Sequence, residues 1–254
     1  MSTDAQQDIF ETLSPHWWDE DGPFKVIHQI TPLRMRWILK AMESLERPLQ
    51  ENLPLSGLRI LDVGCGGGLV AEPLCRLGAS VTGIDQVAGN ITTATAHAQQ
   101  QELPIHYRHE DMTALIAAGE VYDAVIAYEV IEHVENPALF TNQLCQLVKD
   151  TGVLILSTLN RTLASYALGI VLAERVLGWV PQGTHQWKQF IRPRELQAWL
   201  YQNGFAGQQY QGMHFKPLTR QWVLGDRLDV NYFAAAYRQK KGSQHLREDL
   251  RSWG

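Results

Sequence analysis

A glycine-rich turn between two predicted strands is the feature that most constrains this chain. The apolar run Arg59–Val63 leads into Gly64-Cys-Gly-Gly-Gly68, and a second apolar run ends at Asp85. Glycine adopts backbone angles closed to other residues and lets a ligand approach the main chain. In an open parallel sheet, a carboxylate at the end of the second strand can accept hydrogen bonds from both ribose hydroxyls. The segment therefore predicts a nucleoside site, with a purely structural turn as the alternative.

Leu69 distinguishes this turn from a dinucleotide site. The dinucleotide fingerprint G-x-G-x-x-G needs a third glycine, and Leu69 stands in its place. The segment instead resembles motif I of class I S-adenosylmethionine-dependent methyltransferases, which implies S-adenosylmethionine as cofactor. An NAD-binding oxidoreductase and a catalytically silent S-adenosylmethionine-binding protein are the rival classes.

Apolar runs alternate with helical patterns from Arg59 onward, as in a parallel sheet covered on both faces. Strands are predicted at Arg59–Val63, Ser80–Asp85, Ile105–His109, Ala124–Tyr128 and Gly152–Leu159, with two more through Trp222 and Asp229–Tyr237. Helices are predicted at Leu69–Leu77, Ala88–Gln101 and Pro137–Leu147, and another begins near Arg192. The predicted fold is α/β and Rossmann-like, that of a class I methyltransferase with a seven-stranded, mostly parallel sheet.

Segments outside this alternation define the predicted organisation of the chain. We expect an N-terminal helical extension or lid at 1–55, a methyltransferase domain at 56–237, and a mobile tail at 238–254. The extension is predicted to hold a helix at Asp4–Leu13 and a clearer one that starts at Pro32. A helical insertion at about 160–191 follows the fifth strand.

Composition argues against several classes of protein. A formal net charge of -5 over 254 residues disfavours a nucleic-acid-binding surface. Three cysteines without a C-x-x-C pair argue against a disulfide framework or a structural zinc site. The first thirty residues hold six acidic residues against Lys25, which fits neither a secretory signal nor a transit peptide. We therefore expect a cytoplasmic protein.

Three further segments narrow the resemblance to one family. They are Trp17–Arg34, the run Tyr128-Glu-Val-Ile-Glu-His133, and Val180–Ile191 with its Pro-Gln-Gly-Thr-His. From about Trp17 to Tyr237 the chain resembles the ubiquinone biosynthesis O-methyltransferase family. This resemblance implies methylation of ring hydroxyls on polyprenylated catechol and demethylubiquinol intermediates. Another catechol or phenol is the alternative substrate.

The resemblance also implies cofactor contacts. Carried over by position, they are Arg34, Gly64, Asp85 and Tyr128, the last through its backbone. Arg34 can hold the methionine carboxylate through a two-pronged hydrogen bond, and a helix-surface charge is the alternative. Gly66 belongs to the same turn as Gly64.

Two other positions are candidates for contact with the cofactor. Asp111 and Met112 follow the third predicted strand, where this superfamily holds adenine; a solvated Asp and a core Met are the alternative. Trp17 and Trp18 either close over the cofactor or pack within the protein.

Glu129, Glu132 and His133 are the candidate catalytic residues. Their spacing of i, i+3 and i+4 places all three on one face of a helical turn. The resemblance implies that they ligate magnesium, which suits the carboxylates better than the imidazole. A cation chelated by both catechol oxygens would help to remove the phenol proton. His133 as a metal-free general base is the competing interpretation, and a residue group that lines the cofactor site or caps a helix is the third.

The insertion predicts a contact with membrane lipid. As a helix, 163–180 would carry one apolar face through Tyr166 and Ile170, while Leu168 and Leu172 leave the opposite side apolar as well. Because a polyprenyl tail partitions into the bilayer, we expect this segment to associate peripherally with the inner membrane. A subunit contact or a cover over the tail is the alternative, and a ubiquinone-biosynthesis complex is a further expected partner.

Overall fold

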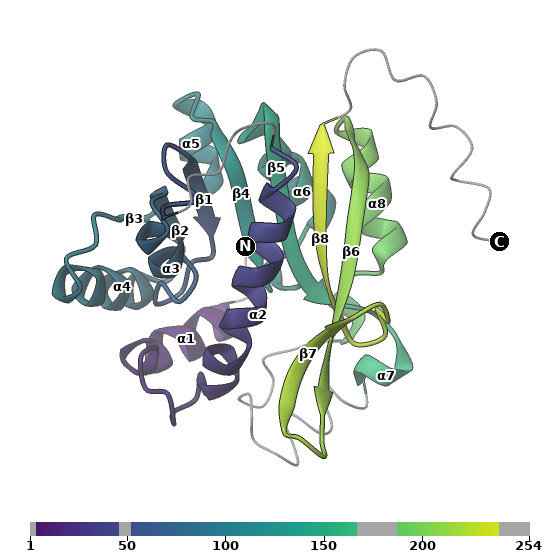
Figure 1. The fold of residues 1–254 in the computed structure, drawn as a ribbon, viewed down its shortest axis with the longest axis horizontal. Coiled ribbons are helices and arrows are strands. Elements are labelled where there is room, and N and C mark those ends of the chain that lie inside the picture. The colour runs from purple at the N-terminus through teal and green to yellow at the C-terminus, as the bar shows by residue number, and fades with distance from the viewer. Residues whose placement is uncertain (1–3, 46–51, 167–186, 239–254) are drawn as a thin grey trace.

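The computed structural model describes residues 4–45, 52–166 and 187–238. Its centre is one eight-stranded sheet with the strand order β3-β2-β1-β4-β5-β8-β6-β7 (Figure 1). The strands are β1 (Arg59–Val63), β2 (Ser80–Asp85), β3 (His106–His109), β4 (Tyr122–Tyr128), β5 (Val148–Leu159), β6 (Phe205–Lys216), β7 (Gln221–Gly225) and β8 (Asn231–Arg238). Strands β1 to β5 are parallel, and β8 runs antiparallel to both β5 and β6.

The predicted α/β class and mostly parallel sheet are confirmed, but the predicted number of strands is wrong. Three strands rather than two close the sheet, because the chain turns back after β6 and forms the antiparallel strand β7. The two strands pair from Gly212 with Gly225 to Lys216 with Gln221. Phe215 and Trp222 lie opposite each other in this hairpin, with ring centroids 5.3 Å apart. Such cross-strand aromatic pairs stabilise a hairpin, and sequence periodicity did not separate its two strands.

Helices precede and connect the strands. They are α1 (Asp4–Leu13), the short 3-10 helix η1 (Ser14–His16), α2 (Lys25–Met42), α3 (Ala71–Arg76), α4 (Ala88–Gln100), α5 (Met112–Ala117), the 3-10 helix η2 (Ile131–His133), α6 (Pro137–Gln146), α7 (Leu163–Ser165), the 3-10 helix η4 (Trp187–Gln189) and α8 (Pro193–Gln202).

The second helix begins earlier than predicted. Pro32 lies inside α2 rather than at its start, although proline removes one backbone donor and disfavours a helix interior. The buried side chains Ile30, Leu33 and Trp37 lie on both sides of it along the helix. Their burial favours one continuous helix from Lys25 onward.

Alternating side chains in the strands build two cores. In β5, Val153 and Ile155 belong to one core, and Leu154 and Leu156 to the other, as the period of two in a strand requires. Helices α2 and α3 cover the first core, and α5, α6 and α8 cover the second (Figure 1). Because both faces are covered, a ligand can reach the sheet only at the edge where the parallel strands end.

Parts of the predicted organisation fall outside the described residues. The predicted insertion is described only at its ends, by α7 and η4. The predicted lipid-contact segment 163–180 is not described from residue 167 on, and the predicted tail is not described from residue 239 on. Within the described ranges, no helix is both long and apolar enough to cross a bilayer.

Candidate active site

The turn after β1 is locked to the end of β2. Gly64 and Gly66 adopt φ angles of 69° and 52°, in the left-handed region that favours glycine. The Asp85 carboxylate accepts hydrogen bonds from the amides of Gly66 at 2.9 Å and Val87 at 2.8 Å. Burial raises the pKa of Asp85, and these two hydrogen bonds oppose the shift. The turn predicted from the glycines is therefore present, with the predicted carboxylate bound directly to it.

A cavity of about 520 Å³ opens at this edge of the sheet, within the size range of small-molecule sites. Nine of the ten predicted site residues line it: Arg34, Gly64, Gly66, Asp85, Asp111, Met112, Tyr128, Glu129 and His133. Apolar side chains complete the wall, among them Phe10, Leu13, Trp17, Leu69 and Phe140. The structure thus brings together nearly all of the positions that the sequence singled out.

Two tryptophans fix the glycine turn from the N-terminal side. The Trp17 ring lies so close over the turn that a Cβ atom on Gly67 would be 2.3 Å from it. Its Nε1 donates to Asn90 Oδ1 at 2.7 Å. The Trp18 indole donates to the carbonyl oxygen of Gly67 at 2.9 Å. Trp17 therefore packs on the turn and also lines the cavity, while its closing over the cofactor stays a prediction.

Arg34 is buried in the cavity wall and is not a helix-surface charge. Its side chain is 5% exposed, and Nη2 lies 2.8 Å from Glu129 Oε1. Its guanidinium carbon lies 5.3 Å from the centroid of the Tyr128 ring. Among the described residues, Arg34 Nε has no hydrogen-bond partner. A buried donor without a partner is costly, so this nitrogen suggests a ligand.

Asp62 is a residue of the site that the sequence analysis missed. It is the second-last residue of β1, lines the cavity and is 3% exposed. Its Oδ2 atom has no hydrogen-bond partner in the described part of the chain. Burial raises the pKa of Asp62 to about 7, with Asp85 adding to the shift and Arg34 opposing it. A charged residue inside an otherwise apolar strand was the signal that could have revealed it.

Asp111 acts locally as a helix cap. Its Oδ1 accepts a hydrogen bond from the Thr113 amide at 2.9 Å at the start of α5, and the hydrogen bonds from Thr113 lower the pKa of Asp111. Met112 is buried beside it in the second core. Both residues line the cavity, so the structural roles do not remove them from it.

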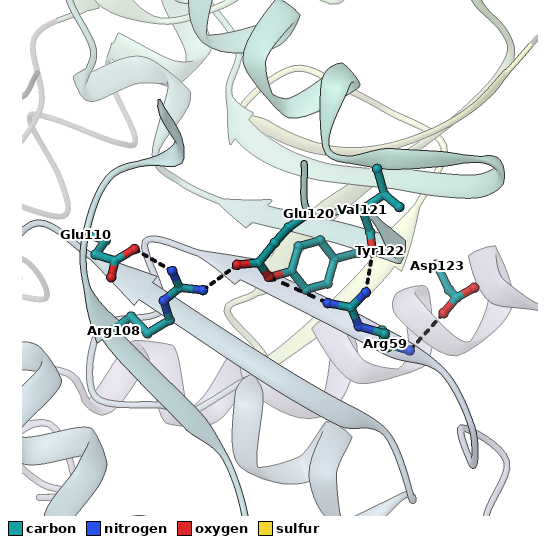
Figure 2. Close-up of polar contacts among 7 residues, drawn as sticks. All are labelled: Arg59, Arg108, Glu110, Glu120, Val121, Tyr122 and Asp123. Atoms are coloured by element: carbon teal, nitrogen blue, oxygen red, sulfur yellow. Dashed lines mark hydrogen bonds and ion pairs between the residues drawn. The ribbon is translucent and has the colours of Figure 1, made fainter. Parts of the chain in front are cut away.

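A row of charged side chains supports the loop that carries Asp111 (Figure 2). Arg108 forms two ion pairs at 2.7 Å, one with Glu110 and one with Glu120. Arg59 lies 3.6 Å from the second oxygen of Glu120. Since Glu110 lines the cavity, the Arg108 pairs connect the cavity wall to the segment that precedes β4.

The predicted arrangement of Glu129, Glu132 and His133 on one helical face is wrong. Helix η2 covers only Ile131–His133, and Glu129 precedes it with a left-handed φ of 56°. Glu132 is buried away from the cavity and accepts a hydrogen bond from the Thr158 hydroxyl at 2.8 Å. His133 lines the cavity. No group of three His, Cys, Asp or Glu side chains within the described ranges is placed to hold a metal ion, so these residues do not fit magnesium in this arrangement.

Comparisons with known proteins agree with the fold and the motifs. A family model described as a methyltransferase domain matches residues 36–210. A ubiquinone biosynthesis O-methyltransferase from Dinoroseobacter shibae is 46% identical over 231 residues, which cover 90% of this chain and 93% of the relative. One from Ruegeria sp. strain TM1040 is 44% identical, with 89% and 93% covered. The chain belongs to the ubiquinone biosynthesis O-methyltransferase family. The predicted family is confirmed, and the oxidoreductase alternative is set aside.

Solved structures agree at the level of the fold. Magnesium protoporphyrin IX methyltransferase from Synechocystis PCC 6803 superposes with a TM-score of 0.59 at 24% identity, covering 84% of this chain and 83% of that protein. The plantazolicin methyltransferase superposes with a TM-score of 0.54 at 16% identity, covering 92% and 100%. These likenesses confirm the predicted class I methyltransferase fold.

Asp62→Asn should make the stability of this family member less dependent on pH. The carboxyl titrates near pH 4 when unfolded and at about 7 in the folded protein. Between these values only the folded state retains the proton, so the stability of the wild type falls as pH rises from about 4 to about 7. The variant lacks this loss, which is on the order of 4 kcal/mol. Denaturant unfolding of the wild type and the variant at about pH 4 and about pH 7 measures this loss. If the two proteins differed in unfolding free energy by the same amount at both pH values, the raised pKa of Asp62 would be contradicted.

Proposed function

We propose that this protein methylates ring hydroxyls of polyprenylated catechol and demethylubiquinol intermediates, with S-adenosylmethionine as the donor. One observation carries this proposal: the buried side chains of Arg34 and Asp62 and the half-buried side chain of Asp85 line a single cavity. They match the carboxylate, the ammonium and the ribose of that cofactor in charge and hydrogen-bonding type. The relatives named above support the choice of acceptor.

Each group of the cofactor has a proposed partner. Arg34 would hold the carboxylate with its guanidinium, and Asp62 would take the ammonium, which would satisfy its Oδ2. Asp85 would accept from the ribose hydroxyls while the amides of Gly66 and Val87 keep it in place. The main chain at Gly64, Gly66 and Tyr128 completes the contacts on this side.

The adenine side is formed by the loop after β3. Asp111 offers a carboxylate for the exocyclic amine, and Met112 offers an apolar wall. The Arg108 ion pairs hold Glu110, the first residue of this loop (Figure 2).

The residues around the cavity align the acceptor and exclude water. Bound S-adenosylmethionine supplies a methyl group on a positively charged sulfur, already activated for transfer. The protein therefore lowers the remaining barrier mainly by aligning this methyl group with the acceptor oxygen. The apolar side chains of Phe10, Trp17 and Leu69 line the cavity and keep water from the acceptor oxygen. A phenol titrates at about pH 10, so its proton needs an acceptor, and we assign that role to His133.

Magnesium stays a prediction that comes from the family resemblance. The structure places Glu132 away from the cavity and pairs Glu129 with Arg34. No step of the proposed reaction therefore goes through a metal ion.

Asp85→Ala should weaken S-adenosylmethionine binding by about 1.5–3 kcal/mol, the range for a hydrogen bond to a charged group. Calorimetry measures the loss. Product mass after incubation with catechol and quinol acceptors tests the transfer itself. Asp150→Ala, which removes a highly exposed carboxylate elsewhere, is the matched control and should change neither quantity. Cofactor affinity that is unchanged in Asp85→Ala would remove Asp85 from the site.

His133→Gln should lower turnover by at least a hundredfold, the lower limit usual for loss of a general base, while cofactor affinity stays as in the wild type. Single-turnover methyl transfer and calorimetry measure the two quantities. Repeating the assay with excess chelator separates the two predicted roles of His133. A base alone works without added cation, whereas a magnesium ligand loses turnover until magnesium is restored.

We also propose a peripheral lipid contact at the edge where the parallel strands end. Leu163, four residues after β5, is 80% exposed, and Leu218, in the turn between β6 and β7, is fully exposed. Both lie at this edge, because β6 runs in the same direction as β5. Lys216 and Arg220 flank Leu218 and are exposed, which suits anionic headgroups.

Replacing Leu163 and Leu218 together with Ser should reduce binding to anionic vesicles at least tenfold, because burying each leucine in lipid contributes on the order of 1.5–3 kcal/mol. Flotation measures the bound fraction. Val121→Ser alters an exposed apolar residue just before β4, at the opposite edge, and should leave binding unchanged. Equal flotation of the double variant and wild type would contradict the proposed contact.

A further inference from the structure

The ion pair between Arg34 and Glu129 occupies the place proposed for the cofactor's carboxylate. We propose that Glu129 substitutes for that carboxylate in the cofactor-free protein, and that S-adenosylmethionine displaces Glu129 from Arg34 when it binds. This inference rests on the proposed function, because it assumes that Arg34 receives the cofactor.

The guanidinium of Arg34 is only partly used in the structure. One edge of a guanidinium presents Nε and Nη2 as two parallel donors, which match the two oxygens of a carboxylate. Glu129 Oε1 lies 2.8 Å from Nη2, whereas Nε is buried and has no hydrogen-bond partner among the described residues. A ligand carboxylate that approached along this edge could bond to both nitrogens. It would therefore also satisfy Nε, which lacks a partner among the described residues.

Glu129 is the partner that can move. Its side chain is 29% exposed, compared with 5% for Arg34, and it lines the cavity through which the ligand must enter. Its backbone has a left-handed φ of 56°, which is uncommon for a residue other than glycine. The amide of Glu129 donates to the Ser157 carbonyl at 2.9 Å. The main chain is thus held, while the partly exposed side chain lines the cavity.

Charge balance explains why the exchange matters for the reaction. Arg34 is the positive group to which Glu129 is paired, and Asp62 lies close enough for Arg34 to oppose the rise in its pKa. A bound amino acid group carries one positive and one negative charge, so its carboxylate replaces Glu129 and its ammonium faces Asp62. Glu129, released from Arg34, then keeps its negative charge at the wall of the cavity that His133 also lines. A carboxylate there would stabilise His133 once it holds the proton of the acceptor, which favours binding of the cofactor before the acceptor.

Glu129→Gln tests the exchange because it keeps the size of the side chain and removes the competing charge. Calorimetry with S-adenosylhomocysteine should show affinity about two- to fivefold higher than in the wild type, the range of a moderately exposed ion pair. For 5′-methylthioadenosine, which lacks the amino acid group, affinity should not change. Glu135→Gln, at an exposed position lining the same cavity, is the matched control and should alter neither affinity.

Other outcomes separate this inference from the proposed function. Weaker or unchanged binding of S-adenosylhomocysteine to Glu129→Gln overturns the exchange, since Glu129 would then position Arg34 or play no part. An equal gain for 5′-methylthioadenosine also overturns it. Absence of any S-adenosylhomocysteine binding to the wild type overturns the proposed function instead. If the glutamine variant does not fold, Glu129→Asp, whose shorter side chain reaches Arg34 less well, should raise the affinity in the same direction by a smaller factor.

Discussion

The close approach of Gly64 to Val130 is the constraint on which the site depends. A Cβ atom at Gly64 would lie 2.5 Å from the Val130 side chain, so only glycine allows the turn after β1 to lie against the segment after β4. Adjacent parallel strands end at the same edge, which brings the loops after β1, β2 and β4 together. The hydrogen bonds from Gly66 and Val87 to Asp85 then join the loop after β2 to the loop after β1. The approach of Gly64 to Val130 and these hydrogen bonds together hold the three loops around the cavity.

The buried charges of this cavity would favour a zwitterionic ligand. Asp62 and Asp85 both have raised pKa values because burial disfavours their ionised forms. Arg34 is buried beside them with one donor left without a partner among the described residues. Such groups are costly to the folded protein on their own. A ligand that carries both a carboxylate and an ammonium would reduce the cost at Arg34 and Asp62 together, so stability and binding are linked at this site.

Much of the fold and part of the site could be predicted from the sequence. The strands and the end of β2 at Asp85 follow from short apolar runs and glycine punctuation, which are local signals. The placement of Glu132 could not be predicted from its spacing. A spacing of three residues from Glu129 puts both side chains on one face only if the chain is helical at both positions, and the sequence does not show whether it is. The left-handed backbone at Glu129 breaks that face. The continuous helix through Pro32 depends on burial against the sheet. The sequence shows Asp62 as a carboxylate within a short apolar segment, but its burial follows only from the packing of the sheet.

The packing of Trp17 on the glycine turn has a consequence for protein engineering. The ring occupies the space next to Gly66 and Gly67, and its indole is anchored to Asn90 in α4. The N-terminal segment and the glycine turn should therefore be exchanged together between related enzymes. A chimera that carries the N-terminal segment of a distant methyltransferase would also need a matching turn and a matching residue at position 90. Without them, the graft would leave an exposed glycine loop and a tryptophan with no surface to cover.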